Sequence, residues 1–308
     1  MKIKISAVIL LFAFSFSVTI GQVTEAEKKL RTANADTTVG WKKGGVVALI
    51  LAQTSLKNWA AGGQNSVAVN GIFSGFANYK KGKSVWDNSL DLGYGLLKQG
   101  KDADYTKTDD KFDFLSKYGR EAFKNFYFSG LLNFRTQMSP GYKYPDTGHK
   151  ISDIFAPAYL LLAIGLDYKP NPYSSAFIAP LTAKFTFVND PVLSAAGAFG
   201  VTPGEKSRGE IGGYLRAIYT KNDFKSEFLK NVSFTSKIDL FSNYSDKPQN
   251  VDVNWETLTA LKVNKFISVN FNTQLLYDDN IKIPIDRNND GIIESTEATG
   301  PRTSLKKF

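Results

Sequence analysis

Residues 266–277 read Phe-Ile-Ser-Val-Asn-Phe-Asn-Thr-Gln-Leu-Leu-Tyr and place apolar side chains at every second position. Residues 251–256, Val-Asp-Val-Asn-Trp-Glu, alternate in the same way. Successive side chains of a strand point to opposite faces, so each run predicts a strand with one apolar and one polar face. In a soluble sandwich the apolar faces meet in a core, whereas in an outer-membrane barrel they face lipid and the polar faces line a lumen.

The composition narrows the choice of protein class. Of the 308 residues 13% are aromatic, as in strand-rich proteins with aromatic girdles. No long apolar run follows the N-terminus, which excludes a helical membrane protein. The absence of Cys excludes disulfides and thiol chemistry, and a single His argues against a His-based zinc site. The net charge is +9, but the lysines are scattered among turns, so we expect no nucleic-acid partner.

The N-terminus predicts export. Lys2 and Lys4 precede an apolar run from Ile5 to Ile20, and small residues follow at a cleavage position, as in a signal peptide. An uncleaved anchor is the alternative. We therefore expect a signal peptide at residues 1–21, a periplasmic lead-in at 22–43, and a barrel in the outer membrane at 44–308.

Twelve alternating runs follow one another along the chain. The predicted strands are 44–55, 65–79, 84–97, 111–118, 124–138, 158–168, 173–188, 208–220, 231–244, 251–261, 266–277 and 303–308. Short connections follow the second, fourth, sixth and tenth strands, and long ones the third, fifth, seventh and eleventh. This sorting predicts an all-β, antiparallel transmembrane outer-membrane β-barrel of about 12 strands, with short periplasmic turns and long extracellular loops. The twelfth run is shorter than the 9–11 residues of a membrane-crossing strand.

Charged side chains fall on the polar faces of these strands. Both signs are present, which predicts ion pairs inside a narrow lumen. The predicted lumen-facing residues are Asp87, Asp91, Arg135, Asp167, Lys184, Arg216, Lys237, Asp239, Asp252 and Glu256.

A motif lies between the first two strands. It reads Asn58-Trp59-Ala60-Ala61-Gly62-Gly63. With Trp41, Trp86 and Gly300-Pro301-Arg302-Thr303, it resembles a family of uncharacterised outer-membrane proteins from Bacteroidetes, a domain of unknown function. The resemblance implies a β-barrel in the outer membrane, supplies no activity, and implies a further strand beyond Phe308. Asn58, Trp59, Gly62 and Gly63 form either a recognition loop or a packed loop with an interfacial Trp, and the second interpretation is favoured.

Residues 286–297 have the spacing of a calcium loop. Oxygen donors stand at Asp286, Asn288, Asp290, Glu294 and Glu297, and the backbone carbonyl of Ile292 takes the seventh position. Gly291 occupies the sixth position, where the chain turns sharply. The sequence therefore predicts a Ca²⁺ site outside an EF-hand pair, with an acidic turn that binds no metal as the alternative.

No catalytic residues are predicted. His149 lies near Ser152 and Asp153, but neighbours within one loop rarely form a catalytic geometry, so we do not expect an enzyme. The leading hypothesis is a narrow selective channel or transporter for a small solute. The alternative is a non-conducting scaffold that presents loops to an envelope protein.

Overall fold

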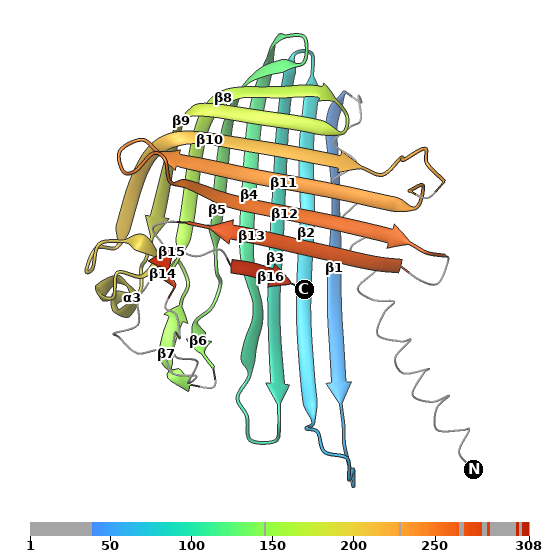
Figure 1. Ribbon diagram of the computed structural model, residues 1–308, viewed down its shortest axis with the longest axis vertical. Helices are drawn as coiled ribbons and strands as arrows, with labels where there is room; N and C mark the ends of the chain where they lie inside the picture. The colour runs from blue at the N-terminus through green and yellow to red at the C-terminus, as the bar shows by residue number, and fades with distance from the viewer. Residues whose placement is uncertain are drawn as a thin grey trace.

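One antiparallel sheet of twelve strands dominates the computed structural model, which describes residues 39–144, 146–227, 229–264, 268–278, 282–283, 300–301 and 304–307 (Figure 1). Its strands, in order across the sheet, are β1 (Gly40–Thr54), β2 (Ser66–Lys81), β3 (Ser84–Gln99), β4 (Thr106–Phe123), β5 (Phe126–Thr136), β8 (Ala158–Asn171), β9 (Ser174–Phe187), β10 (Ser207–Lys221), β11 (Val232–Asn243), β12 (Val251–Lys262), β13 (Ser268–Tyr277) and β16 (Ser304–Lys307). The prediction of an all-β antiparallel chain is confirmed.

Short elements occupy the long connections. β6 (Gly141–Lys143) pairs with β7 (Asp146–Ser152), and β14 (Lys282–Ile283) pairs with β15 (Gly300–Pro301). A short helix, α3 (Pro191–Ala195), and a 3-10 turn, η2 (Ala198–Gly200), lie between β9 and β10. No helix in the described part of the chain is long and apolar enough to cross a membrane.

Two strands begin well before the residue that the sequence pattern predicts. β1 begins at Gly40, inside the predicted lead-in, because Trp41 pairs with Tyr79 of β2. β4 begins at Thr106 rather than 111. Its charged start resembles a loop in composition, but Lys107 donates hydrogen bonds to Asp110, to Gln137 and to the carbonyl of Ser139. These hydrogen bonds give the charged groups of Lys107 and Asp110 partners within the protein, whereas the sequence pattern predicts that they are hydrated in a loop.

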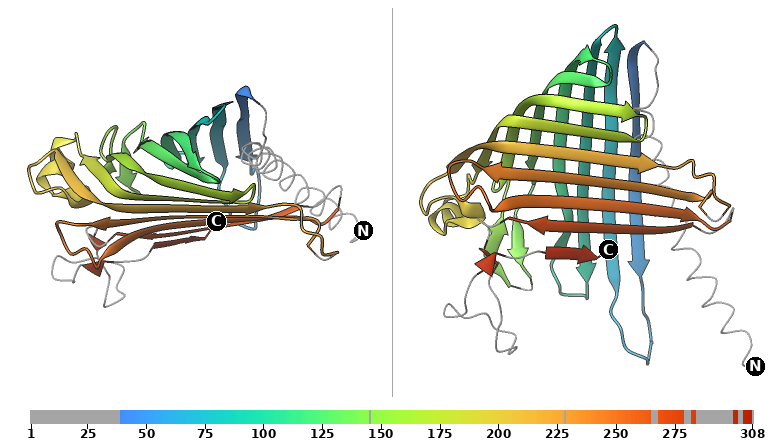
Figure 2. Two further views of the ribbon diagram at one scale, coloured as in Figure 1. Left: turned by 90° about the horizontal axis from the view of Figure 1, so that it is seen from above. Right: turned by 45° about the horizontal axis from the view of Figure 1, so that its top comes forward.

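The sheet curls over itself. In Figure 1 strands β1 to β4 run vertically and β10 to β13 cross in front of them, and Figure 2 shows the two halves as layers from above. The register shifts on both sides of β9, between Ile164 and Leu166 of β8 and between Gly212 and Tyr214 of β10. Pro180 of β9 lies at this irregularity, where its missing N–H removes no ladder hydrogen bond. Such bulges bend a strand and increase its twist.

The sheet is open in the structure. Among the described residues no ladder joins β1 to β13 or β16, so β1 is an edge strand. The connections are sorted between the two ends of the strands. One end, here called the turn edge, carries the connections from β2 to β3, β4 to β5, β8 to β9, β10 to β11 and β12 to β13. The other, the loop edge, carries longer connections such as 137–157 and 188–206.

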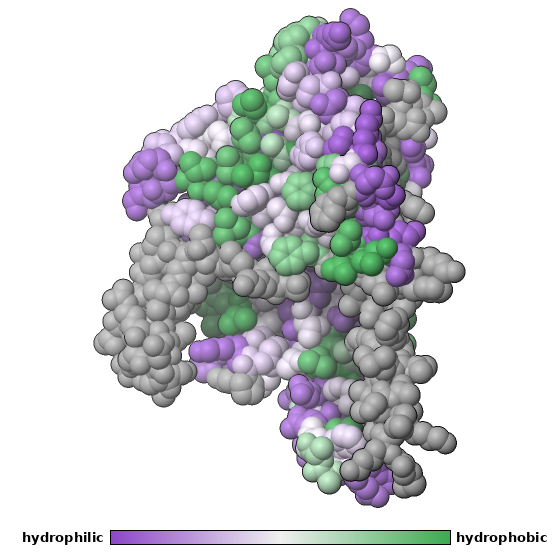
Figure 3. Space-filling model, turned by 45° about the vertical axis from the view of Figure 1, so that its right-hand side comes forward, coloured by the Kyte–Doolittle hydropathy of each residue, from purple (hydrophilic) through white to green (hydrophobic). Residues whose placement is uncertain are grey.

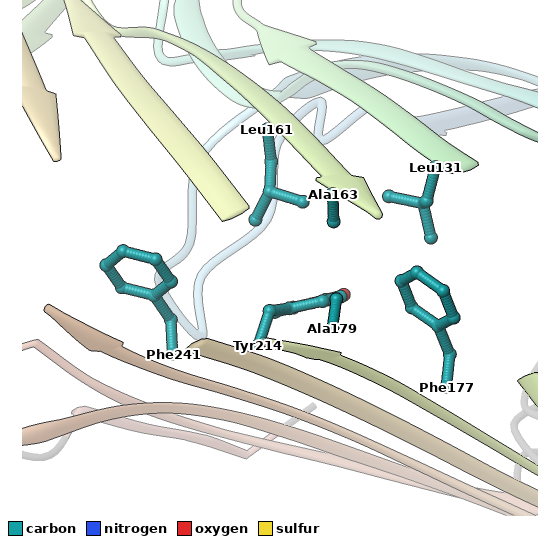
Figure 4. Close-up of a cluster of buried hydrophobic side chains, with 7 residues drawn as sticks. All are labelled: Leu131, Leu161, Ala163, Phe177, Ala179, Tyr214 and Phe241. Carbon is teal, nitrogen blue, oxygen red and sulfur yellow. The ribbon is translucent and has the colours of Figure 1, made fainter. Parts of the chain in front are cut away.

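The two faces of the sheet differ in polarity. The outer face exposes large apolar side chains: Val47, Leu49, Leu51, Phe128, Ile164, Ile178, Leu181, Ile211 and Phe271. Inside the curl, Leu131, Leu161 and Ala163 face Phe177, Ala179, Tyr214 and Phe241 from the opposite layer (Figure 4). Around this small cluster the inner face is polar, and Asp167, Glu210 and Asp239 are all buried there. A water-soluble fold has the reverse arrangement, with polar groups outside.

Candidate functional site: the charged interior of the sheet

The strand register places all ten predicted lumen-facing residues on the inner face. Asp87 lies opposite Lys117, Asp91 opposite Asp113, and Arg216 opposite Asp239. Eight of the ten form ion pairs on that face, namely Asp87, Asp167, Lys184, Arg216, Lys237, Asp239, Asp252 and Glu256. The side chains come from strands that lie far apart in sequence, so the curl of the sheet assembles the site.

The first ionic group centres on Asp167 of β8. Its carboxylate lies 2.6 Å from the Lys117 Nζ and 3.5 Å from the Lys169 Nζ, and the Lys169 Nζ lies 3.1 Å from Asp87. Only 1% of the Asp167 side chain is exposed, so it needs these cations to offset the loss of hydration. The Lys117 Nζ also lies 5.9 Å from the ring centroid of Phe177. This group joins β3, β4 and β8 across the interior.

The second ionic group joins β9 to β12. The Lys184 Nζ lies 2.7 Å from Asp252 and 3.6 Å from Glu210. The Arg216 guanidinium donates to Asp239 at 3.1 Å. Lys237 pairs with Glu256 at 3.3 Å. Most of these pairs bridge adjacent strands, whereas Lys184–Asp252 joins β9 to β12 across the interior.

Sequence reasoning missed Lys117, Lys169 and Glu210. A signal for Lys117 exists, because it alternates in phase with Asp113 and Leu115 on a strand that the composition makes hard to recognise. Lys169 lies close to a turn and resembles a solvated turn residue. Only the opposed layers show that its ammonium group reaches Asp87.

Two hollows lie inside the curl. The larger, of about 460 Å³, is lined by strands of both layers, and its charged lining is Asp110, Lys111, Arg135, Lys184, Asp239, Asp252 and Asp278. The smaller, of about 130 Å³, is lined by polar groups of β2 to β5 and β10 to β12. Arg135 and Asp239 line both hollows. We call the two together the charged chamber.

The motif loop lies away from the chamber, between β1 and β2. Asn58, Gly62 and Gly63 have φ values of 54°, 79° and 111°, and Trp59 is 62% exposed. Glycine is needed at positions 62 and 63 because L side chains rarely adopt such φ values. A Cβ on Gly63 would also lie 2.9 Å from Leu56 Cδ1. The loop therefore has a specific shape, and Trp59 extends from it into solvent.

A compact cap covers part of the loop edge. The Lys150 Nζ of β7 lies 2.6 Å from Asp153 and 2.8 Å from Asp190, and Asp190 also accepts from the Val192 and Leu193 amides as the N-cap of α3. The hydrogen bond to Asp153, followed by that to Asp190, raises the pKa of Lys150. The hydrogen bond from Lys150 in turn holds the pKa of Asp190 below its ordinary value. Asp153 is thus engaged in an ion pair beside His149 and the buried Ser152.

The predicted calcium loop, residues 286–297, lies outside the described residues, as does the predicted signal peptide at 1–21. Among the residues that the structure describes, no group of three or more His, Cys, Asp or Glu side chains is arranged to hold a metal ion.

Comparison with known proteins gives one match. Residues 51–142 match a family described as protein of unknown function (DUF3078). The matched segment runs from the end of β1 to β6 and includes the motif loop. The expected resemblance to a domain of unknown function is confirmed over these residues. No curated protein and no solved structure matches the chain.

Proposed function

We propose that the chain is an outer-membrane β-barrel whose narrow interior admits a small solute. The observation that carries this proposal is the inverted polarity of the sheet. Ile164 of β8 is 66% exposed and Val47 of β1 is 79% exposed, whereas Asp167 has 1% of its side chain exposed. Exposed apolar surface of this extent marks a membrane or protein contact. Lipid is favoured because the pattern recurs on strands from β1 to β13.

The outer face supports the same proposal in two further ways. Figure 3 shows hydrophobic residues in patches within the near surface, with hydrophilic residues around its margins. An apolar hollow of about 800 Å³ on the outer face, lined by side chains such as Leu132, Leu162 and Leu181, offers space to lipid tails. Both features are typical of a surface immersed in hydrocarbon.

Aromatic and basic residues mark the turn edge. Trp41 contacts Tyr79 and Trp86, with ring centroids 5.2 and 5.7 Å apart, and Lys43 lies 5.6 Å from the Trp41 ring. Lysines in or beside the turns at this edge are Lys80, Lys81, Lys83, Lys124, Lys221, Lys225, Lys230 and Lys262. Aromatic girdles lie at membrane interfaces, and lysines near an anionic leaflet each contribute about 1 kcal/mol of attraction. We assign the turn edge to the periplasm and the loop edge to the cell exterior.

A membrane location requires the sheet to close. Unpaired backbone groups of an edge strand cost several kcal/mol each in hydrocarbon, so β1 needs a partner strand there. β1 suits this role because its outward side chains are apolar along most of its length. We therefore propose closure of the barrel at β1 on insertion.

The interior favours a narrow passage over an open pore. The ion pairs of the two groups and the cluster around Phe177 occupy much of the space between the layers. In a planar bilayer we expect small or absent conductance. Shortening the cross-strand Arg216 to Ala should raise it, while Arg120→Ala on the outer face of β4 serves as the control. Large, porin-like steps in the conductance of the parent protein would refute the narrow passage.

The alternative function is a non-conducting scaffold that presents loops to an envelope protein. The cap at the loop edge favours it, because an apolar cluster of Ala156, Val188, Leu193 and Val201 packs under α3. If neither the parent protein nor Arg216→Ala conducts ions in the planar bilayer, although both fold normally, the scaffold is supported.

The calcium loop and the signal peptide are part of the proposal. Extracellular calcium modules bind with dissociation constants of roughly 10⁻⁴–10⁻³ M, which suits a loop at the exterior edge. Residues 286–297 come after β13 in the sequence, and β13 ends at the loop edge. We propose that Ca²⁺ draws the carboxylates of this loop together and stabilises it. Cleavage of residues 1–21 would accompany export.

A further inference from the structure

Three hydrogen-bond donors line one wall of the larger hollow. Lys111 of β4, Arg135 of β5 and Tyr159 of β8 come from neighbouring strands, and Tyr159 stands directly opposite Arg135 in the ladder. Within the part of the chain that the structure describes, no hydrogen bond or ion pair joins their side chains to another residue. Lys111 is exposed, and Arg135 and Tyr159 are half-buried. The Nε of Arg135 is buried, so its terminal guanidinium nitrogens are the ones that can meet a solute.

The opposite wall of this hollow carries acceptors. Asp252 and Asn254 of β12 and Gln274 of β13 line it. The Gln274 amide nitrogen donates to Asn254 at 3.1 Å, and Asp252 pairs with Lys184 at 2.7 Å. A carboxylate has about four acceptor positions, and the oxygen of a side-chain amide has two. Asp252 and Gln274 therefore keep acceptor capacity beyond these contacts.

The charge of the chamber argues against an ionic solute. Seven carboxylates and five cations line its two hollows. An anion would add to this negative excess. A cation would meet carboxylates that are mostly paired already, as Asp252 is with Lys184 and Asp239 with Arg216. A neutral solute avoids the cost of removing a charge from water.

Aromatic rings lie among these polar groups. Phe112, Tyr159 and Phe241 line the larger hollow, and Phe241 extends toward the opposite layer in Figure 4. Its volume of about 460 Å³ falls within the range of roughly 300–1,000 Å³ that is usual for small-molecule sites. A hydroxyl group both donates and accepts hydrogen bonds, so a solute with several hydroxyls can satisfy both walls at once. The C–H faces of a sugar ring can pack against the aromatic rings.

We propose that the larger hollow of the charged chamber binds a neutral mono- or disaccharide. The terminal nitrogens of Arg135 and the hydroxyl of Tyr159 donate to sugar oxygens on one wall. Sugar hydroxyls donate to Asp252 and to the amide oxygen of Gln274 on the other. This inference rests on the proposed function and names its class of solute, and binding can be tested without conduction.

The test is calorimetric titration of the refolded full-length protein in detergent micelles. The probes are glucose, maltose and lactose, compared with N-acetylleucine amide, a neutral solute that has no hydroxyl group. We expect at least one of the sugars to bind, and N-acetylleucine amide to bind at least about tenfold more weakly, because it leaves several hydrogen-bonding groups of the hollow without partners. Binding of none of the three sugars, or equal binding of N-acetylleucine amide, would overturn the proposal.

Tyr159→Phe locates the site with the smallest change. It removes one hydroxyl and keeps the ring, so sugar binding should weaken about two- to tenfold, the range of one neutral hydrogen bond. Tyr168→Phe makes the same change on an exposed tyrosine of β8 that stacks on Phe126, and it should leave binding unchanged. Equal binding by Tyr159→Phe and Tyr168→Phe would count against the assigned wall.

Arg135→Ala tests the charged donor. Sugar binding should weaken at least about tenfold, because a hydrogen bond from a charged group is the stronger kind. Arg120→Ala removes an exposed arginine of β4 and serves as the control. Gel migration before and after boiling checks that each variant folds. If Arg135→Ala fails to fold, Tyr159→Phe decides. Undiminished binding by folded Arg135→Ala would overturn the proposal.

Transport separates the two proposals. Sugar binding in micelles without sugar entry into protein-containing vesicles would refute the channel and leave the sugar site intact. Entry of small solutes into vesicles, at a rate that is the same for sugars and for N-acetylleucine amide and is unaffected by Tyr159→Phe, would support the channel and refute the site.

Discussion

Replacing Ile164 by Arg tests directly whether the outer face lies in lipid. Ile164 stands near the middle of β8 and is 66% exposed, beside Leu181 and Ile211 of the same outer hollow. On a surface that faces water, such a substitution changes the free energy of unfolding by no more than about 0.5 kcal/mol. At the midplane of a bilayer an outward Arg costs about 2–4 kcal/mol.

A control of matched chemistry isolates the effect of depth. Val263 follows β12 at the turn edge and is 50% exposed, so Val263→Arg inserts the same side chain near the membrane interface. There the cost falls to about 0–1 kcal/mol. We therefore expect the free energy of unfolding of Ile164→Arg to be about 1–4 kcal/mol lower than that of Val263→Arg, a difference that exposure alone does not predict.

The assay is urea unfolding of each variant in phospholipid vesicles, followed by the fluorescence of the four tryptophans. The free energies are comparable if the slope with urea is unchanged, because that slope reports the surface exposed on unfolding. Two variants of equal stability, or a greater loss for Val263→Arg, would refute placement of the outer face in hydrocarbon.

Three further predictions follow. Gly165→Ala places a Cβ 2.0 Å from the Ile178 carbonyl oxygen, so it should lower the free energy of unfolding, measured with denaturant, by about 3 kcal/mol or more. Gly130→Ala should leave that free energy nearly unchanged, because no atom lies within 4 Å of the new Cβ. Because the Asp190 pKa is lowered, its stabilisation of the cap is present above about pH 4 and is lost as the pH falls below that. The rate of proteolysis within the cap should rise as the pH is lowered in the parent protein and should not change with pH in Asp190→Asn. Calcium should slow protease cleavage within residues 286–297, and Asp290→Ala should abolish that effect. Equal cleavage with calcium and with chelator would refute the metal site and support an acidic turn that binds no metal.

The bend of the sheet could have been found in part from sequence. Pro180 interrupts the alternating run of β9, and Gly212-Gly213 interrupts that of β10. Proline within a central strand indicates a bulge, because it cannot donate to the ladder. The pattern locates the irregularity, but the direction and extent of the curl depend on how the layers pack across Phe177 and Tyr214.

The sequence by itself determined where most strands run and which face each side chain takes. Both follow from the two-residue period of a strand, which is a local property of the chain. It therefore located Asp167 and Arg216 on the polar face. It failed at the start of β4, where Lys and Asp are rare in strands and indicate a loop.

Only the tertiary structure decided which charges meet. Lys117 and Asp167 are 50 residues apart, and Lys169 and Asp87 are 82 apart, so no local pattern links them. The curl also decided that the buried Nε of Arg135 has no hydrogen-bond partner among the residues that the structure describes. Ion pairing depends on distances of a few ångströms between side chains, and the packing of two layers sets those distances.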